Sequence, residues 1–314
     1  MSDNRQYFIC PFDSRRHSWR IWCSHRRYWI FIWGHDIFQE FMVVNIFVKG
    51  EERSILLEEA KYKHTVSILT ACLNEAGNIG KWLDQISNII TYEKLYSIVE
   101  VVIVDDGSTD GTVEEVLKRV ESYPIPLRMI QRNVKMGTLN AQIIGSRRCL
   151  SEYVLTMDCD LQHPVDFIPD FIEKLEDDPD IVIGSRYMPG GYNSWPAYRG
   201  FVSRTATLLS HALITSSRKV KDPLSGYFLI KRDTISGLEP YSGMYKLLLY
   251  AISVSGNSRM VEIPIRMEDR NSGESKVVTN PVRVVFKYLR EVLVFFKASS
   301  SKLETSGLDT KKEI

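Results

Sequence analysis

The stretch Tyr153–Pro164, which reads YVLTMDCDLQHP, decides how the rest of the chain is interpreted. Its first four residues are apolar or β-branched, as is typical of a buried strand, and Pro164 prevents the chain from continuing in that strand. Asp158 and Asp160 follow two residues apart, so both carboxylates point to one side if the backbone stays extended. Oxygen ligands at this spacing suit a hard divalent cation, Mg²⁺ or Mn²⁺. Two acids after a strand are more often part of a turn than of a metal site, so the assignment depends on the other motifs of the chain.

Composition limits the class of protein. The chain has 314 residues, of which 44% are hydrophobic and 25% charged, as expected for a globular protein of one large or two small domains. The net charge of +1 gives no global attraction to nucleic acid, so anion binding must come from local clusters. The five cysteines include no C-x-x-C pair, which argues against a disulfide framework and a zinc site and favours a reducing compartment.

Residues 1–60 differ from the remainder and are interpreted as an N-terminal extension. The first 41 residues contain four of the six tryptophans and many arginines without a clear period. The apolar stretch Tyr28–Val48 is interrupted by polar and charged residues, which a membrane-spanning helix tolerates poorly. The segment is either an aromatic, basic segment at a membrane interface or a mis-assigned extension before a natural start at Met42. The second interpretation is favoured, because an interfacial helix should have a cleaner amphipathic pattern.

From about His64 onward, strand patterns alternate with helix patterns. Strands are expected at 65–70, 98–104, 127–130, 153–157 and 181–183, with helices at 79–90, 113–120, 137–148 and 167–175. This order predicts βαβ units and an α/β fold whose mixed, mostly parallel sheet is flanked by helices. Ligands of such sheets bind beyond the carboxyl ends of the strands, where four acids fall: Asp105, Asp106, Asp158 and Asp160. No G-x-G-x-x-G follows the first strand, which argues against a dinucleotide oxidoreductase.

The C-terminal third contains a second amphipathic signal. A helix is expected over 198–215, a late strand over 261–265 and a basic loop over 270–276. A further helix over 281–297 has one polar stripe, formed by Arg283, Lys287, Arg290, Glu291 and Lys297. These charges exclude a simple transmembrane helix, and the wide apolar remainder fits a helix lying in a membrane interface. The alternative is packing on the domain or on a partner subunit. Residues 301–314 are polar and are expected to form a disordered tail.

Five separated motifs occur in one order along the chain. They are NEA at 74–76, DDGSTDGT at 105–112, DCDLQHP at 158–164, GSRY at 184–187 and R-x-x-G-x-S-K at 270–276, with KMG at 135–137 and D-x-x-S-G at 222–226 between them. Each motif alone is weakly specific, but the ordered set is strongly specific. Together they resemble the inverting family 2 glycosyltransferases, most closely the dolichyl-phosphate (polyprenyl-phosphate) mannosyltransferases, over residues 65–280.

The resemblance implies a GT-A fold over residues 61–280 and transfer of mannose from GDP-mannose to dolichyl or polyprenyl phosphate with inversion. It implies a nucleotide pocket formed by Asn74, Glu75, Asp105, Asp106 and Asp158. It assigns the Mg²⁺ or Mn²⁺ ion to Asp158, Asp160 and Gln162. The acceptor phosphate would be held by Arg186, Arg199, Ser203, Arg270 and Lys276. The residues that would carry catalysis are Asp160, Arg186, Arg199 and Arg270.

The chemistry agrees with these implied roles. Charge builds on the leaving nucleoside diphosphate, and a metal stabilises that charge. Paired arginines can clamp an anionic acceptor by forked hydrogen bonds. Because a lipid phosphate is already ionised at neutral pH, direct in-line attack on the anomeric carbon is expected without an obligatory general base.

Several alternatives stay open. Where the family's first strand commonly ends in Pro-Thr-Tyr, this chain has Ala71–Leu73, so the choice between GDP and UDP is undecided and UDP-glucose remains possible. A glycan acceptor or a non-catalytic sugar-nucleotide-binding subunit are further alternatives. Asp105 could only cap a helix, Asp222 could only build a turn, and His163 is expected to be structural. The transmembrane hairpins of some relatives are not found in this sequence. The resemblance therefore implies a peripheral protein on the cytoplasmic face of a membrane, which reaches lipid through its terminal helix or a small membrane-protein partner.

Overall fold

The computed structural model describes two parts of the chain. It covers five strands within residues 1–61, and residues 64–296 except 96, 134, 242–245, 257 and 268–287. The chain divides into two compact units, Met1–Lys61 and Tyr62–Ile314.

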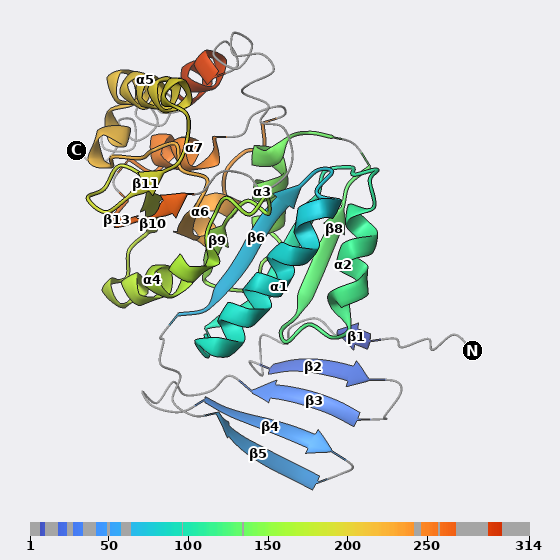
Figure 1. Ribbon diagram of the computed structural model, residues 1–314. Coiled ribbons are helices and arrows are strands. Elements are labelled where there is room, and N and C mark those ends of the chain that lie inside the picture. The colour runs from blue at the N-terminus through green and yellow to red at the C-terminus, as the bar shows by residue number, and fades with distance from the viewer. Residues whose placement is uncertain are drawn as a thin grey trace, which may run out of the picture. The chain divides into compact units, whose positions relative to one another are not determined.

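The first unit is a small antiparallel sheet, with strand order β1-β2-β3-β4-β5 (Figure 1). Its strands are β1 (Tyr7–Ile9), β2 (Ser18–Cys23), β3 (Tyr28–Trp33), β4 (Met42–Val48) and β5 (Glu51–Leu57). Neither interpretation of this segment from the sequence included a sheet. Its arginine and tryptophan residues obscure the alternation of apolar and polar side chains by which a half-buried strand is recognised.

The second unit is built on a seven-stranded sheet with the order β13-β10-β12-β9-β6-β7-β8. Its strands are β6 (Val66–Cys72), β7 (Ile98–Asp105), β8 (Leu127–Gln131), β9 (Tyr153–Thr156), β10 (Ile181–Ser185), β12 (Phe228–Lys231) and β13 (Met260–Pro264). All neighbours pair in parallel except β12, which is antiparallel to both β9 and β10. The predicted mixed, mostly parallel sheet is therefore confirmed.

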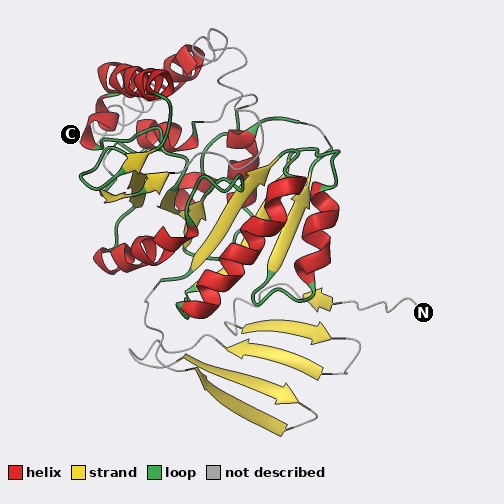
Figure 2. Cartoon of the chain, in the orientation of Figure 1, coloured by secondary structure: helices red, strands yellow, loops and turns green. Residues whose placement is uncertain are grey.

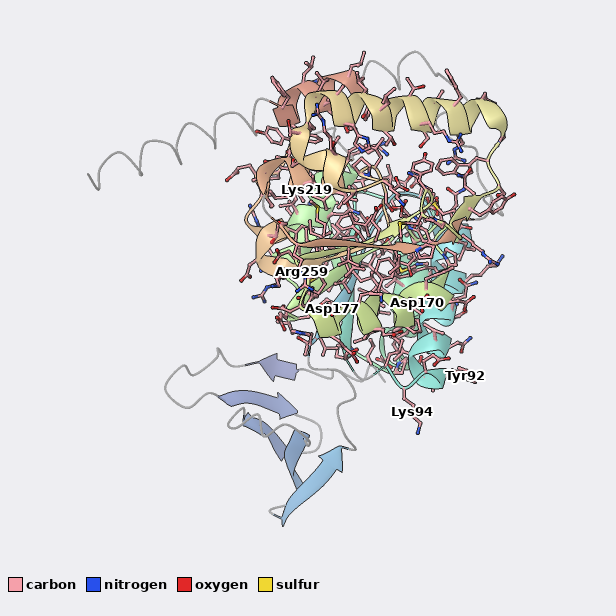
Figure 3. All side chains as sticks on the ribbon, turned by 90° about the vertical axis from the view of Figure 1, so that its left-hand side faces the viewer. Tyr92, Lys94, Asp170, Asp177, Lys219 and Arg259 are labelled. Atoms are coloured by element: carbon pink, nitrogen blue, oxygen red, sulfur yellow. The ribbon has the colours of Figure 1, made fainter. Side chains whose placement is uncertain are left out.

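Helices cover both faces of this sheet (Figure 2). They are α1 (Ala76–Tyr92), α2 (Thr112–Val120), α3 (Thr138–Ser146), α4 (Ile168–Glu173), α5 (Ala197–Leu213), α6 (Arg232–Ser236) and α7 (Leu247–Val254). Successive strand residues point to opposite faces, so Val66 and Ile68 join a core cluster with α1 and α4, whereas Leu69 joins a second cluster with α3, α6 and α7. Tyr92, at the end of α1, and Asp177, beyond α4, lie at the end of the unit opposite α5 (Figure 3).

Residues 288–296 are helical and pack against the rest of the second unit. Tyr288 and Val292 are buried, and the Phe295 ring stacks on Tyr250 of α7 with 4.9 Å between centroids. Glu291 is only 1% exposed, so its assignment to an outward polar stripe is wrong: it faces the same side as the buried apolar residues. Leu293 remains outside at 53% exposure. The described part of this helix therefore follows the packing alternative, and residues 281–287 lie outside the described residues.

No helix in the described part of the chain is both long and apolar enough to cross a membrane.

A glycine in α3 allows the helix to approach the sheet. A Cβ atom at Gly145 would lie 2.5 Å from Leu69 Cδ1 and 2.7 Å from Val104 Cγ2, both in the buried core. We therefore expect Gly145→Ala to lower the free energy of unfolding by about 1–3 kcal/mol through overpacking. Urea denaturation measures the change. Gly77→Ala in α1 is the matched control, because its Cβ meets no atom within 4 Å. Equal stability of the two variants would contradict the close approach.

Candidate active site

The loops that follow β6 and β7 are held together by hydrogen bonds at the carboxyl edge of the sheet. The backbone N–H of Asn74 donates to Ser108 Oγ (2.8 Å), and the side-chain Oδ1 of Asn74 accepts from the backbone N–H of Thr109 (2.9 Å). Asn74 has a φ of 57°, a left-handed conformation that asparagine tolerates better than most residues. The Glu75 N–H donates to Thr112 Oγ1 (2.9 Å). The two predicted nucleotide-binding loops therefore form one surface.

Asp105 and Asp106 are buried and shape the backbone of this surface. Asp105 is 0% exposed and accepts the Ser108 N–H at 3.1 Å, whereas the N-cap of α2 is Gly111, so Asp105 builds the turn and does not cap the helix. Asp106 is 4% exposed and accepts the N–H groups of Met136 (3.0 Å) and Gly137 (2.8 Å). Asp106 thus fixes the backbone of Met136 and Gly137, the last two residues of the KMG motif. Binding of nucleotide by either carboxylate stays a prediction.

Arg132 is a candidate that the sequence analysis did not identify. It directly follows β8, and its Nη2 lies 3.5 Å from Asp106 Oδ1. The side chain is only 10% exposed, and neither Nη1 nor Nη2 has a hydrogen-bond partner among the described residues. A buried guanidinium with unfilled donors is well suited to an anionic or carbonyl-rich ligand. The sequence does contain an indication of this residue, because Arg132 follows a predicted parallel strand and so falls at the same edge of the sheet as the acidic motifs.

The predicted metal-binding loop is tightly folded after β9. The Met157 N–H donates to Leu69 O (3.2 Å), so strand-like pairing with β6 continues beyond Thr156. The Asp158 N–H donates to His163 Nδ1 (2.8 Å), and the buried His163 ring stacks on Tyr227 with 5.0 Å between centroids. His163 is therefore structural, as expected.

Asp160 and Gln162 complete this loop. Asp160 is 5% exposed, and its Oδ1 accepts the Gln162 N–H at 3.1 Å. The described residues contain no cluster of three or more His, Cys, Asp or Glu side chains arranged to hold a metal. Two carboxylates and one amide oxygen are nevertheless the hard donors that Mg²⁺ and Mn²⁺ accept, when other ligands come from water and substrate phosphate. The donor set therefore fits such an ion.

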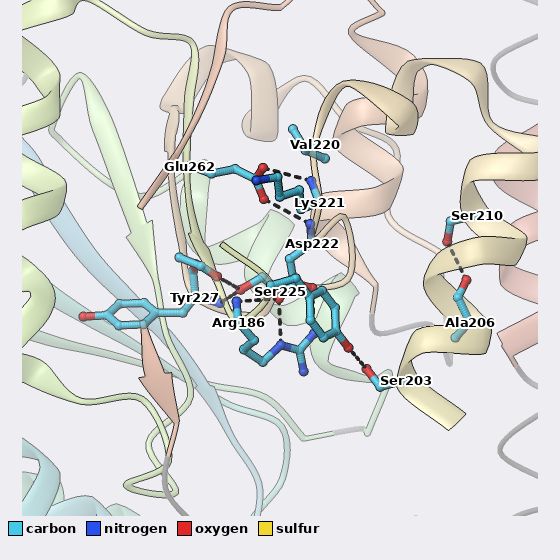
Figure 4. A network of polar contacts seen from close by, with 12 residues as sticks. Arg186, Ser203, Ala206, Ser210, Val220, Lys221, Asp222, Ser225, Tyr227 and Glu262 are labelled. Carbon is cyan, nitrogen blue, oxygen red and sulfur yellow. Dashed lines mark hydrogen bonds and ion pairs between the residues drawn. The ribbon is translucent and has the colours of Figure 1, made fainter. Parts of the chain in front are cut away.

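A buried ion pair joins the loop after β10 to the loop before β12 (Figure 4). Arg186 donates Nε to Asp222 Oδ2 and Nη2 to Asp222 Oδ1, both at 2.7 Å, and Asp222 is 0% exposed. Burial opposes the charge on Arg186, but the adjacent carboxylate outweighs burial and the pKa of the guanidinium is raised. The N–H groups of Lys221 and Asp222 donate to Glu262 of β13 at 2.9 and 3.0 Å. Asp222 therefore does more than build a turn, because it fixes Arg186.

Trp195 brings two predicted phosphate-binding arginines together. The Arg199 guanidinium carbon lies 4.0 Å from the indole centroid and that of Arg186 lies 4.8 Å from it. The Tyr187 hydroxyl donates to Ser203 Oγ (2.8 Å), which places Ser203 of α5 beside this cluster. Sequence reasoning assigned no role to Trp195 or Tyr187, although both lie within the GSRY-to-helix segment. The predicted residues Arg270 and Lys276 lie outside the described residues.

Lys246, which precedes α7, is a second basic group close to this cluster that the sequence analysis did not identify. Loss of hydration, together with the Arg186 charge, lowers the pKa of its ammonium group. The carboxylates of Glu291, Asp222 and Asp158 act in the opposite direction. The lysine therefore lies within electrostatic reach of both the buried ion pair and the predicted metal-binding loop.

Residues 67–235 match the model of glycosyl transferase family 2. The chain belongs to this family. This glycosyltransferase is 32% identical over 233 residues to the dolichol-phosphate mannosyltransferase of Pyrococcus furiosus, a match that covers 74% of this chain and 64% of that protein. The chain thus spans just under two thirds of the length of that relative. It is also 32% identical over 206 residues to the dolichol-phosphate mannosyltransferase of Saccharomyces cerevisiae, covering 62% of this chain and 75% of that protein.

Comparison with solved structures supports the predicted GT-A fold of this glycosyltransferase. Glucosyl-3-phosphoglycerate synthase from Mycobacterium tuberculosis, in complex with Mn²⁺ and uridine-diphosphate-glucose, superimposes with a TM-score of 0.55 at 21% identity, covering 76% of this chain and 80% of that one. The predicted GT-A type of fold is therefore confirmed.

The buried ion pair yields a stability prediction. We expect Asp222→Asn to destabilise the domain by about 3–5 kcal/mol, because Arg186 would remain buried without its partner charge. Asp233→Asn removes the exposed partner of Arg232 and should change stability by less than about 1 kcal/mol. Urea unfolding monitored by circular dichroism measures both. A loss for Asp222→Asn no larger than for Asp233→Asn would contradict the assigned burial of the pair.

Proposed function

We propose that this glycosyltransferase moves mannose from GDP-mannose to dolichyl or polyprenyl phosphate and inverts the anomeric carbon. The observation that carries the proposal is the pair of guanidinium groups on the ring of Trp195, next to the Ser203 hydroxyl. Arginine donors and a hydroxyl suit a phosphate acceptor better than a neutral sugar hydroxyl. The names of the relatives from Pyrococcus furiosus and Saccharomyces cerevisiae support the same sugar and the same acceptor class.

On the donor side, the residues of the sheet edge would bind the nucleotide. Asn74 and Glu75 lie on the joined loops, and the Arg132 guanidinium adds unfilled donors at the same edge. Asp158, Asp160 and Gln162 would hold Mg²⁺ or Mn²⁺. When bound, such an ion stabilises the negative charge of the leaving diphosphate. Asp160 is pre-oriented for this role by the Gln162 N–H.

On the acceptor side, the arginines orient the nucleophile. Arg186 is fixed by Asp222, and Arg199 is held over Trp195, so neither has to reorganise when the anion arrives. An ionised phosphate oxygen of the lipid forms the new bond to the anomeric carbon as the bond to GDP breaks. Because no proton has to be removed from that oxygen, the chain needs no general base.

We further propose that the exposed face of α5 lies on the membrane surface. Three large apolar side chains of α5 are exposed: Tyr198 (53%), Phe201 (73%) and Leu208 (69%). Leu293 and Phe296 of the terminal helix are also exposed, at 53% and 44%. Several exposed apolar side chains on one helix face fit peripheral attachment to a membrane. Cys72, Cys149 and Cys159 are free and buried, in keeping with the cytoplasmic face, and a small membrane-protein partner stays a prediction.

The decisive experiment measures transfer of radiolabelled sugar from GDP-mannose, and in parallel from UDP-glucose, to dolichyl phosphate in detergent with Mg²⁺ or Mn²⁺. Chloroform-soluble label from GDP-mannose that EDTA abolishes supports the proposal. Label transferred only from UDP-glucose would keep lipid phosphate as the acceptor and would change the proposed donor to UDP-glucose. No lipid-linked label from either donor, with nucleotide binding intact, rejects the lipid acceptor.

The metal assignment yields a prediction for Asp158. We expect Asp158→Asn to reduce transfer by at least about 100-fold, because removing one preorganised charge-stabilising group has an effect of this size. The activity that remains should require more Mn²⁺ for half-saturation. Asp166→Asn, in the same segment but outside the proposed donor set, is the matched control. Full activity of Asp158→Asn with unchanged metal dependence would reject this assignment.

The tryptophan yields a prediction about acceptor binding. We expect Trp195→Leu to raise KM for the lipid phosphate roughly 3- to 30-fold, the range expected from loss of cation–π contacts that hold the arginines. KM for GDP-mannose should change little. Trp195→Phe keeps an aromatic face and should restore much of the acceptor affinity. If Trp195→Leu raised KM for the donor and not for the acceptor, the assigned acceptor site would be incorrect.

A further inference from the structure

The Asp158–Pro164 loop, which contains the proposed metal donors, has a strained backbone. Leu161, between Asp160 and Gln162, has a φ of 65°. A left-handed backbone is unfavourable for leucine and persists only where surrounding contacts hold it. One such contact lies within the loop, where the Gln162 N–H donates to Asp160 Oδ1 (3.1 Å). The loop therefore depends on further contacts to keep its donors in place.

His163 closes this loop. Its buried ring accepts the Asp158 backbone N–H on Nδ1 at 2.8 Å. The neutral ring therefore has its proton on Nε2. Asp158 is the second residue after β9, and the pairing of this strand with β6 still includes the Met157 N–H, which donates to Leu69 O (3.2 Å). The backbone of the first proposed metal donor is thus held between the sheet on one side and the His163 ring on the other.

Tyr227, the residue before β12, supports the end of the loop. Its ring stacks on the His163 ring, with 5.0 Å between centroids and 19° between planes. Its hydroxyl donates to Pro164 O (3.1 Å). Burial raises the pKa of this hydroxyl well above its usual value, so the group keeps its proton and remains a donor. One side chain therefore holds the last two residues of the loop.

Tyr227 is itself fixed by its neighbours. Its carbonyl accepts the Gly184 N–H of β10 (2.9 Å), and the Ser225 hydroxyl donates to Gly184 O (2.7 Å). The Phe171 ring of α4 packs against the Tyr227 ring with 4.6 Å between centroids. Figure 4 shows the Tyr227 side chain directed away from Arg186. Its contacts therefore support the metal-binding loop and not the acceptor arginines.

We propose that His163 and Tyr227 are positioning residues for the divalent ion. They act through the backbone of the loop, which they hold in the shape that presents Asp158, Asp160 and Gln162 to the metal. Groups that orient metal ligands commonly set metal affinity without contacting the ion. The proposal rests on the metal donors assigned in the proposed function, and it adds two residues that determine how tightly those donors bind.

Titration with Mn²⁺, followed by electron paramagnetic resonance, tests these roles without measuring activity. The full chain is kept in excess over GDP, and in a parallel series over UDP, so that the nucleotide is bound to protein. Asp158→Asn changes a proposed donor and is the reference variant. If Asp158→Asn binds Mn²⁺ as tightly as the unchanged chain, the metal assignment of the proposed function is rejected, and the positioning roles are rejected with it.

Tyr227→Phe keeps the stacked ring and removes only the hydrogen bond to Pro164 O. We expect Mn²⁺ binding to weaken roughly 2- to 10-fold, the effect of one lost hydrogen bond. Tyr153→Phe is the matched control, because Tyr153 is also fully buried and its hydroxyl donates to Pro179 O (2.8 Å), but it lies at the start of β9, away from the loop. Both variants should lose similar stability in urea. Equal Mn²⁺ affinity of the two would overturn the role of Tyr227.

His163→Phe keeps a ring against Tyr227 but removes the acceptor of the Asp158 N–H. We expect Mn²⁺ binding to weaken about 10- to 100-fold, as is typical when a group that orients a metal ligand is lost. His163→Asn should restore much of the affinity, because its amide oxygen can accept the same N–H. A residue that only stabilised the fold would not produce this order of affinities. Unchanged Mn²⁺ binding by His163→Phe, or weaker binding by His163→Asn than by His163→Phe, would overturn the role of His163.

These outcomes separate the inference from the proposed function. Weaker Mn²⁺ binding by Asp158→Asn, without any change in Tyr227→Phe and His163→Phe, would reject the positioning roles and leave the metal assignment intact. Because the titrations require neither mannose nor a lipid acceptor, failure of mannose transfer with the expected order of Mn²⁺ affinities would reject the proposed reaction alone.

Discussion

The ion pair between Arg186 and Asp222 is the interaction on which the geometry of the site depends. Both side chains are almost completely removed from solvent, so neither charge can remain there without the other. Glu262 of β13 holds the backbone of Lys221 and Asp222 by two hydrogen bonds, and Asp222 in turn fixes Arg186. A series of hydrogen bonds thus connects β13, at the edge of the sheet, to the guanidinium group of Arg186 in the candidate active site. Each step is a short, directional contact.

A buried ion pair of this kind contributes more to selecting a single side-chain arrangement than to the free energy of unfolding. Removing two charges from water costs several kcal/mol, and their attraction only offsets that cost when the geometry is good. Here the two parallel hydrogen bonds at 2.7 Å provide that geometry. The consequence for function is that Arg186 is preorganised but largely neutralised. Further positive charge for an acceptor must therefore come from the other basic residues predicted to bind it, which are Arg199, Arg270 and Lys276.

The sequence predicted the part of the fold that follows from local pattern. The strands from β6 to β10 are nearly continuous apolar runs separated by amphipathic helices, so their existence and parallel pairing could be inferred. The short helices α6 and α7 were missed, since five or eight residues give too few turns for a clear period. Glu291 was misplaced for a different reason, because its burial depends on contacts with other elements and not on its own helix.

The candidate site shows the same division between local motif and tertiary contact. The resemblance carried by the ordered motifs predicted roles for Asp158, Asp160, Arg186 and Arg199. It could not identify Trp195 as the ring between two arginines, because the approach of Arg186 depends on how the chain folds back through β11 (Tyr192–Asn193). Nor could it give Asp222 its role, because pairing with Arg186 spans 36 residues.

The direction of β12 explains why these distant residues meet. Because β12 runs antiparallel between β9 and β10, the loop before it lies at the edge where those two strands end. That loop contains Asp222 and Gly226, and it therefore faces Arg186 beyond β10 and the acidic loop beyond β9. A Cβ atom at Gly226 would lie 3.5 Å from Asp158 Oδ2 and 3.3 Å from the His163 ring. One reversed strand thus connects the carboxylates on the proposed donor side with the guanidinium groups on the proposed acceptor side.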